Sequence, residues 1–397
     1  MARQVFGLGE GPVTHPAITP PSLPSLYRIT ADAFPRRNPG GCCNSVDKIT
    51  IIFRHPITTP PSQAVMDEVI MSSPLLKKSL VVPATYPRAP ATVQSPGVQL
   101  SIAVNEYRPS KVGSGATLLL THGTSFCKEM WEPLIEFWFR VDSPLRHQAV
   151  FAIDAVNHGD SAVLNRGLLG TSMYWPDHSR DILGVLEHLG ITGPLIGIGH
   201  SFGGGTLAHA SILSPKTFDA TILVEPILFQ MKEQTTKIAK LVLNRRDTWK
   251  NLDDACTAIS NSKGFADWSL NQRRRYATFA THDVLINSQT VRALKTSKEQ
   301  ESRETQATYL AGPHPQIVDL LSKSREPHYY IMGGKSLVLN EDCRAVTQTL
   351  SRIHGDMAVV QDGGHLLPMA HPAELGSVLE GFIAKILLRI SHTQSNL

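Results

Sequence analysis

Cysteine is scarce in this chain, with five among 397 residues. The number is odd, and no two of them have the Cys-x-x-Cys spacing. Such a set argues against a disulfide framework and against a structural zinc site, and it is typical of proteins from a reducing compartment. We therefore expect no metal site.

Long apolar runs and a strong charge bias are also absent. No stretch of 18 consecutive apolar residues occurs, and five prolines interrupt the first thirty residues. We therefore expect neither a membrane-spanning helix nor a conventional signal peptide. The formal net charge is only +4, and no basic run is interleaved with aromatic residues. This pattern argues against nucleic acid as a partner.

The amino-terminal segment differs in composition from the rest of the chain. Residues 1–62 hold 10 of the 27 prolines, and their only strand-like stretch is Ile49–Phe53. We interpret residues 1–74 as an appendage that is largely extended or disordered. The remaining length and the 42% of hydrophobic residues are sufficient for one large domain with a sizeable core.

From Leu80 onward, apolar strand-like runs alternate with helical patterns. This alternation predicts an α/β fold with a mostly parallel central sheet and helices on both faces. Residues 229–325 differ, because their pattern is helical and polar, Val291–Leu294 included, and contains no buried strand run. We interpret them as a helical cap over the carboxyl edge of the sheet, inserted between core segments 75–228 and 326–397.

The most specific motif is Gly199-His200-Ser201-Phe202-Gly203, which joins the apolar run Pro194–Ile198 to a segment of small residues. A Gly-x-Ser-x-Gly between a buried strand and a helix is typical of a nucleophile elbow, a strained turn that exposes the serine hydroxyl. Ser201 is therefore the candidate nucleophile. The alternative is a glycine-rich turn whose serine has no chemical role.

A serine hydroxyl needs a base within hydrogen-bond reach, because it is a poor nucleophile at neutral pH. His365 follows two glycines in the loop after the last predicted strand. From that loop an imidazole can reach the hydroxyl of Ser201. The order of serine, acid and histidine along the chain is that of α/β-hydrolases.

The acid is harder to choose. Its usual place is the turn after the strand that ends at Met332, but that turn reads Gly333-Gly334-Lys335-Ser336 and has no carboxylate. We select Glu225, at the carboxyl end of the preceding strand, as the group that orients His365. Glu341 and Asp342, at the start of the next helix, are the alternatives, although either could simply initiate that helix.

Two backbone amides are candidates for an oxyanion hole. One is the amide of Thr124, in the loop after the strand 116–121, and the other is that of Phe202, directly after the nucleophile. We expect His122 to be a structural hydrogen-bonding residue beneath this loop. The turn Asp154–Ser161 should brace the same edge of the sheet through local side-chain to backbone bonds.

The basic triplet Arg273, Arg274 and Arg275 lies in the predicted cap. Such a cluster could receive the phosphates of a CoA thioester. The alternative is a solvated helical face with no ligand.

Taken together, these motifs resemble the α/β-hydrolase superfamily over residues 75–390. The resemblance is carried by the His122-Gly123 loop with Lys128-Glu129-x-Trp131-Glu132-Pro133, the turn Asp154–Ser161, Gly-His-Ser201-Phe-Gly-Gly, Glu225 and Gly-Gly-His365. The sequence is most similar to a fungal branch of acyl-CoA hydrolases, toxin-biosynthesis hydrolases and a yeast peroxisomal lipase. In that branch the acid also follows the strand after the elbow, where Asp rather than Glu would be expected. The resemblance implies hydrolysis of an acyl thioester or ester with a bulky hydrophobic acyl group, for example in secondary metabolism.

The hypothesis is a serine hydrolase that works through an acyl-enzyme, without a metal or redox cofactor, on a small-molecule acyl ester or acyl-CoA. A lipase or acyltransferase with the same triad and a catalytically silent ligand-binding protein are the alternatives. The sequence leaves a homodimer open. The terminal Ser395-Asn396-Leu397 is a degenerate form of the peroxisomal Ser-Lys-Leu address, so both peroxisome and cytoplasm remain as locations.

Overall fold

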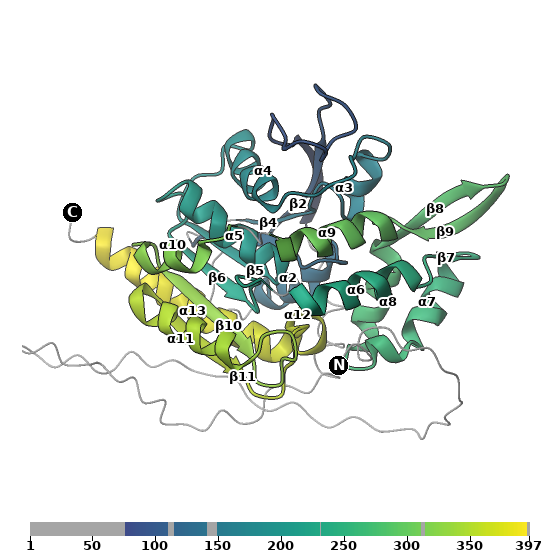
Figure 1. The fold of residues 1–397 in the computed structure, drawn as a ribbon. Helices are drawn as coiled ribbons and strands as arrows, with labels where there is room; N and C mark the ends of the chain where they lie inside the picture. The colour runs from purple at the N-terminus through teal and green to yellow at the C-terminus, as the bar shows by residue number, and fades with distance from the viewer. Residues whose placement is uncertain (1–75, 110–114, 141–148, 231, 311–313, 395–397) are drawn as a thin grey trace, which may run out of the picture. The chain divides into compact units, whose positions relative to one another are not determined.

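The computed structural model describes residues 76–109, 115–140, 149–230, 232–310 and 314–394 (Figure 1). The chain divides into two compact units, and the smaller one, Glu10–Pro60, lies wholly outside the described residues. The predicted appendage, residues 1–74, and the terminal Ser395–Leu397 also lie outside them.

A sheet of eight strands forms the centre of the larger unit. The strand order is β1-β2-β4-β3-β5-β6-β10-β11. β2 is antiparallel to both of its neighbours, and every other neighbouring pair is parallel, so the mostly parallel sheet is confirmed. The strands are β1 (Leu76–Pro83), β2 (Ser101–Arg108), β3 (Thr117–Thr121), β4 (Val150–Ile153), β5 (Leu195–His200), β6 (Ala220–Val224), β10 (His328–Gly333) and β11 (Asp356–Val360).

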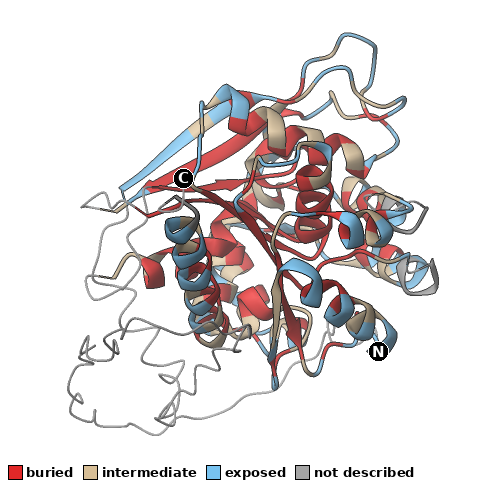
Figure 2. Cartoon of the chain, turned by 90° about the vertical axis from the view of Figure 1, so that its left-hand side faces the viewer, coloured by how far each residue is buried: buried red, intermediate tan, exposed pale blue. Residues whose placement is uncertain are grey.

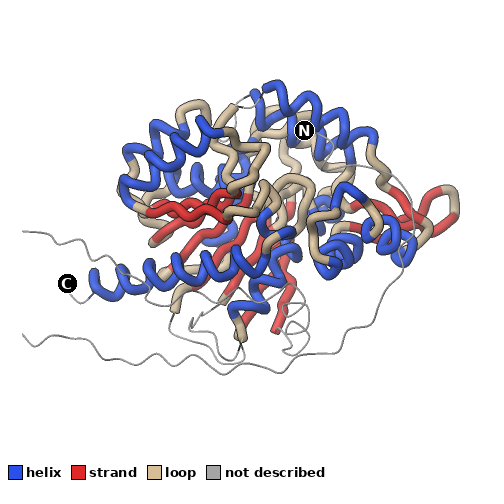
Figure 3. The backbone as a smooth tube through the Cα atoms, turned by 90° about the horizontal axis from the view of Figure 1, so that it is seen from below, coloured by secondary structure: helices blue, strands red, loops and turns tan. Residues whose placement is uncertain are grey.

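Helices cover both faces of this sheet, as Figure 3 shows from below. One face carries α2 (Glu132–Trp138) and α13 (Pro372–Gln394), and the other carries α4 (Trp175–His188), α5 (Phe202–Leu213), α10 (Ile317–Lys323) and α11 (Glu341–His354). Alternate residues of β3 point to opposite faces: Leu118 and Leu120 join the first core cluster, whereas Leu119 joins the second. The central strands are therefore buried on both sides, as the burial colours of Figure 2 show.

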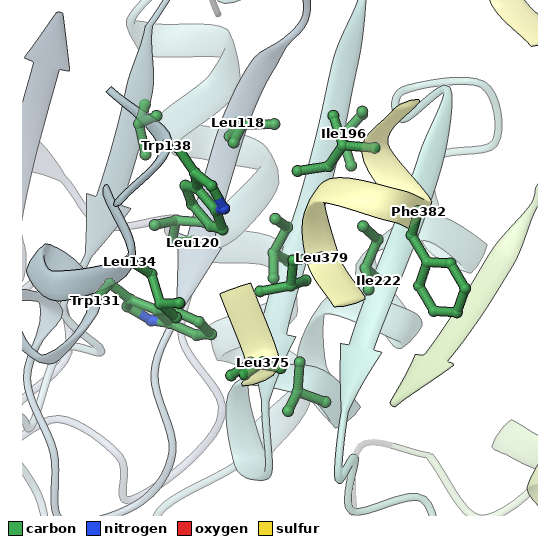
Figure 4. Packing of buried hydrophobic residues seen from close by; sticks show 14 of the residues in the cluster. Leu118, Leu120, Trp131, Leu134, Trp138, Ile196, Ile222, Leu375, Leu379 and Phe382 are labelled. Carbon is green, nitrogen blue, oxygen red and sulfur yellow. The ribbon is translucent and has the colours of Figure 1, made fainter. Parts of the chain in front are cut away.

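The first core cluster is drawn in Figure 4, where Leu375, Leu379 and Phe382 of α13 face Ile196 and Ile222 of the sheet. Short connecting helices complete the core: α3 (Gly159–Leu164), α12 (Leu367–Ala370) and the 3-10 helix η2 (Lys128–Trp131).

The chain between β6 and α10 forms an additional layer with its own small sheet. Its helices are α6 (Lys232–Asn244), α7 (Leu252–Ser260), η3 (Lys263–Phe265), α8 (Leu270–Phe279) and α9 (Lys298–Leu310). Three antiparallel strands, β7 (Thr248–Trp249), β8 (Thr281–Ile286) and β9 (Gln289–Leu294), are ordered β7-β9-β8. α10, which follows this layer in the chain, packs on the sheet instead: its Ile317 and Leu321 belong to the second core cluster.

The helical interpretation of Val291–Leu294 is wrong, because these residues belong to β9. β8 and β9 are joined by the two-residue turn Asn287-Ser288, and both residues have positive φ, 48° and 62°. This is the geometry of a type I′ hairpin. The hairpin extends away from the helices (Figure 1), and most of its side chains are at least partly exposed, so it shows no apolar strand run.

A buried ion-pair network holds the loops at the carboxyl edge of the sheet. The Lys128 ammonium lies 2.8 Å from Asp154, 2.9 Å from Glu129 and 2.6 Å from Asp160. Burial alone would lower the pKa of Lys128, but the three carboxylates raise it above its ordinary value. Asp154 also accepts the backbone N–H groups of Lys128 and Asp160, at 2.8 and 2.9 Å, as expected for a bracing turn. The three carboxylates are close enough together to hold a metal ion, but the Lys128 ammonium already supplies the balancing charge.

Four histidines are buried at the same edge: His122, His158, His178 and His200. Burial lowers the pKa of each, and it lowers those of His178 and His200 to about 3. These imidazoles are therefore neutral at physiological pH.

Within the described residues no helix combines the length and apolar character needed to cross a bilayer.

The buried histidines predict a fall in stability as the pH drops below about 6.5, the ordinary pKa of histidine. Below that pH the unfolded chain binds protons that the folded chain excludes, so the free energy of unfolding decreases. Between pH 7.5 and 5.5, His178 and His200, whose pKa values are lowered to about 3, should each account for a loss of about 1.4 kcal/mol. Urea unfolding of the wild type and of His178→Leu at the two pH values measures this loss in the free energy of unfolding. The variant should lose less between the two pH values, and an unchanged pH dependence would contradict the assignment.

The packing of α13 makes a second prediction. Leu379 is fully buried beneath the sheet, whereas Leu388 on the same helix is 61% exposed. Leu379→Ala should lower the free energy of unfolding by about 2–5 kcal/mol, because it leaves a cavity. Leu388→Ala has the same effect on helix propensity and should lower the free energy of unfolding by less than about 0.5 kcal/mol. Similar losses in urea unfolding of the two variants would be inconsistent with this packing.

Candidate active site

Ser201 occupies a strained turn between β5 and α5. Its φ and ψ are 54° and −118°, outside the regions that a non-glycine residue adopts without cost. A Cβ on Gly199 would lie 2.7 Å from the Gly203 carbonyl oxygen, and one on Gly203 would lie 2.5 Å from that of His122. Glycine is therefore required at both positions, because the strand, the helix and the neighbouring loop approach one another too closely for a side chain.

The structure brings Ser201, His365 and Glu225 together in one hydrogen-bonded row. The Nε2 of His365 is 2.9 Å from the Oγ of Ser201, and its Nδ1 is 3.0 Å from the Oε2 of Glu225. A carboxylate can only accept, so Nδ1 carries the proton and Nε2 is free to accept one. Glu225 is fully buried, whereas the His365 side chain is 14% exposed.

Glu225 is held by the turn that itself lacks a carboxylate. Its Oε1 accepts the N–H of Gly333 at 2.7 Å, and its Oε2 accepts the hydroxyl of Ser336 at 2.6 Å. The backbone of Glu225 has a positive φ of 48°, and its N–H donates to Ile331 at 2.8 Å. Ser336 was not singled out as a site residue from the sequence, although it lies in the turn where the acid was expected.

The alternative acids lie elsewhere. Glu341 and Asp342 are exposed on the first turn of α11, which begins after the capping residue Asn340. Asn340 accepts the N–H of Cys343 at 2.9 Å, as an N-cap does. Within the described residues, Glu225 is the carboxylate that contacts His365.

His200 anchors the loop that carries His365. Its Nε2 is 2.9 Å from the carbonyl oxygen of His365. The ring is neutral, because burial lowers its pKa to about 3, and the carbonyl can only accept, so Nε2–H is the donor. No sequence signal indicated this role, because His200 stands at a variable position of the elbow motif.

Of the two candidate oxyanion amides, that of Phe202 belongs to the elbow and that of Thr124 lies in the loop after β3. Phe202 is the first residue of α5, so its N–H has no partner inside the helix and lies at the positive end of the helix dipole. Within the described part of the chain, neither this amide nor that of Thr124 donates to a protein acceptor. Both remain available to a bound anion.

His122 fixes the loop before Thr124 from below. Its Nδ1 donates to the carbonyl of Gly123 at 2.8 Å, and its Nε2 accepts the N–H of Ala155 at 3.2 Å. The structural role expected for His122 is confirmed, because both of its ring nitrogens bond to the backbone.

The arginine triplet does not form a common ligand site. Arg273 donates to the carbonyl oxygens of Trp268, Ser260 and Ala266. Arg275 is paired with Glu132 and Glu136 of α2, and only Arg274 is exposed. Two of the three guanidinium groups thus have internal partners, which disfavours a shared phosphate site, and phosphate binding by Arg273, Arg274 and Arg275 stays a prediction.

A cavity of about 210 Å³ lies inside the additional layer, between α6, α7, α8 and β9. Its wall is mainly apolar and includes Leu241, Trp249, Ile259, Phe265 and Leu294. Ser201, Glu225 and His365 are not among the residues that line it. This cavity is consequently separate from the hydrogen-bonded row.

Residues 118–377 match the model of the alpha/beta hydrolase family. Among curated proteins, the Peroxisomal membrane protein LPX1 of Saccharomyces cerevisiae is 33% identical over 169 residues, which are 39% of this chain and 44% of that protein. The Type I acyl-CoA thioesterase mpaH' of Penicillium brevicompactum is 32% identical over 135 residues, 32% of this chain and 31% of that protein. The chain thus matches less than half the length of either relative.

Solved structures share the fold. The peroxisomal alpha-beta-hydrolase Lpx1 of Saccharomyces cerevisiae aligns over 79% of this chain and 90% of its own, with a TM-score of 0.69 and 21% identity. The thioesterase domain from the curacin biosynthetic pathway aligns over 77% and 99%, with a TM-score of 0.54 and 17% identity. Likeness at these identities concerns the fold alone. Because the family match extends over more than half of the sequence and the sheet order and elbow agree with it, the chain belongs to the alpha/beta hydrolase family.

Proposed function

We propose that this protein is a serine hydrolase that cleaves an acyl thioester or carboxylic ester of a hydrophobic acyl group through an acyl-enzyme. The observation that carries the proposal is the continuous row from the hydroxyl of Ser201 through the imidazole of His365 to the carboxylate of Glu225. It supplies a nucleophile, a base and a group that orients the base.

In the first half of the reaction, the Ser201 oxygen attacks the acyl carbonyl and its proton passes to Nε2 of His365. The developing imidazolium is stabilised by Glu225, whose carboxylate accepts a hydrogen bond from the Nδ1–H group and stays ionised. The N–H groups of Thr124 and Phe202 bind the oxyanion. When the tetrahedral intermediate collapses, the bond to the leaving group breaks, and His365 returns its proton to the departing thiolate or alkoxide.

In the second half, water takes the place of the leaving group. His365 removes a proton from the water, whose oxygen attacks the acyl-enzyme carbonyl. Collapse of the second tetrahedral intermediate releases the carboxylic acid and restores the Ser201 hydroxyl. Every step uses side chains, backbone amides and water.

The mechanism predicts covalent labelling of Ser201 by a fluorophosphonate probe, measured by mass spectrometry of the labelled peptide. Ser201→Ala should abolish labelling. Absence of labelling in the wild type would favour a catalytically silent ligand-binding protein. Undiminished labelling in Ser201→Ala would place the reactive nucleophile elsewhere, and either result would remove the mechanism.

Paired variants test the acid. Glu225→Gln should lower kcat by about 10³- to 10⁴-fold, the loss seen when the acid of a serine triad becomes an amide. Glu341→Gln is the matched control and should leave kcat unchanged. The opposite pattern would assign the acid to α11.

The substrate class is the finer part of the proposal. Thioester hydrolysis is supported by the relatives named Type I acyl-CoA thioesterases in Penicillium. A lipase or an acyltransferase could use the same three side chains, so the acyl acceptor and the leaving group have to be measured.

We expect kcat/KM for a medium-chain acyl-CoA to exceed that for the ethyl ester of the same acid by about 10-fold or more, a difference of about 1.4 kcal/mol in transition-state binding. The assay is thiol or acid release from matched substrate pairs. Faster cleavage of the ester would identify an esterase or lipase. Transfer of the acyl group to an added alcohol in preference to water would identify an acyltransferase.

A further inference from the structure

Ser125, the residue after Thr124 in the proposed oxyanion loop, is held through each of its polar groups. Its N–H donates to Nε2 of His158 at 3.1 Å, and its carbonyl accepts from the hydroxyl of Tyr276 at 3.3 Å. Its hydroxyl donates to the carboxylate of Glu301. Ser125 also has a φ of 77°, in the left-handed region that favours glycine. A serine keeps this conformation only when its surroundings impose it.

The contact with Glu301 comes from the cap. Glu301 lies on α9 and is fully buried, and its second oxygen pairs with the guanidinium of Arg245, which directly follows α6. A buried carboxylate is costly unless it is paired and fully hydrogen-bonded. Arg245 and the Ser125 hydroxyl together provide those partners, so the packing of α9 and the position of Ser125 depend on each other.

A second connection runs from the same helix to the N–H of Ser125. Glu304, also fully buried on α9, accepts from the side-chain amide of Asn157 at 2.9 Å. The amide oxygen of Asn157 lies 2.8 Å from Nδ1 of His158. Burial lowers the pKa of His158 well below its ordinary value, so the ring is neutral. It therefore donates through Nδ1 to Asn157 and accepts the Ser125 N–H through Nε2.

Glu301 and Glu304 are three residues apart on α9, a spacing that places both on one side of a helix. One reaches Ser125 directly, and the other reaches it through Asn157 and His158. We propose that α9 of the cap positions the oxyanion loop, and that Glu301 and Glu304 are positioning residues for the reaction proposed above, on which this inference rests. They act through Ser125 by holding its left-handed conformation in the turn that the Phe126 N–H closes on the carbonyl oxygen of Gly123, at 3.2 Å. That carbonyl belongs to the same peptide group as the N–H of Thr124, so the geometry of the turn sets the direction of this N–H.

Two roles are open to these contacts, and they differ in their kinetic effect. A simple attachment of the cap would change stability or substrate affinity when it is removed. A positioning role changes the rate of the chemical step, because a misplaced donor stabilises the oxyanion less in the transition state. A variant that lowers kcat and leaves KM unchanged therefore indicates the positioning role, and one that changes KM alone indicates simple attachment.

The test uses Ser125→Ala, Glu301→Gln and the double variant in the full-length protein, with kcat and KM measured on the substrate that the wild type turns over. Each single variant should lower kcat by about 10- to 100-fold and change KM by less than about 2-fold. The double variant should be about as slow as Ser125→Ala, because both changes act on one hydrogen bond: Ser125→Ala removes its donor, and Glu301→Gln replaces the charged acceptor with a weaker neutral one.

Two further variants serve as controls. Glu299→Gln, at an exposed position on the first turn of α9, should leave kcat and KM unchanged. Ser125→Gly also lacks the hydroxyl but adopts positive φ without strain, so it should retain more activity than Ser125→Ala. Thermal unfolding of each variant identifies any that fail to fold.

Unchanged kcat in folded Ser125→Ala and Glu301→Gln, or an effect on KM alone, would overturn the positioning role while the wild type still turns over. A wild type with neither turnover nor fluorophosphonate labelling would overturn the proposed function itself. The two failures are therefore distinguishable.

Discussion

The site depends on the burial of one carboxylate. Glu225 is fully enclosed, and a buried carboxylate must be met by donors from several directions. Those donors come from the end of β10, from the turn after it and from the loop after β11. The strand order β6-β10-β11 brings these segments beside the end of β6. Glu225 can therefore be buried with these three donors only in a sheet where β10 and β11 follow β6.

The same principle extends to the loops around the site. Lys128 pairs with Asp154 in the loop after β4, and the carboxylate of Glu301 on α9 contacts Ser125 in the loop after β3. Each contact joins segments far apart in the sequence and is costly to break once buried. The carboxyl edge is consequently held by polar networks, whereas the two faces of the sheet are held by apolar packing.

Much of the fold and part of the site could be predicted from local patterns. Buried parallel strands are apolar on both faces and therefore conspicuous, and the glycines of the elbow are required by close backbone contacts. The hairpin β8–β9 was missed because its side chains are largely exposed and its alternation is weak. The internal partners of the arginine triplet could not be predicted, because composition does not reveal which guanidinium groups are paired inside the fold.

The elbow around Ser201, the alternation that builds the sheet and a histidine loop after the last strand could all be recognised in the amino-acid sequence, since each depends on residues within one short segment. Glu225 could be selected from the sequence, but only the folded chain decided between it and Glu341 or Asp342 as the partner of His365. The residues that hold Ser125 were also evident only in the folded chain. These contacts depend on which strands are neighbours and on how α9 lies over the loop, because hydrogen bonds act over about 3 Å in space, whatever the separation along the chain.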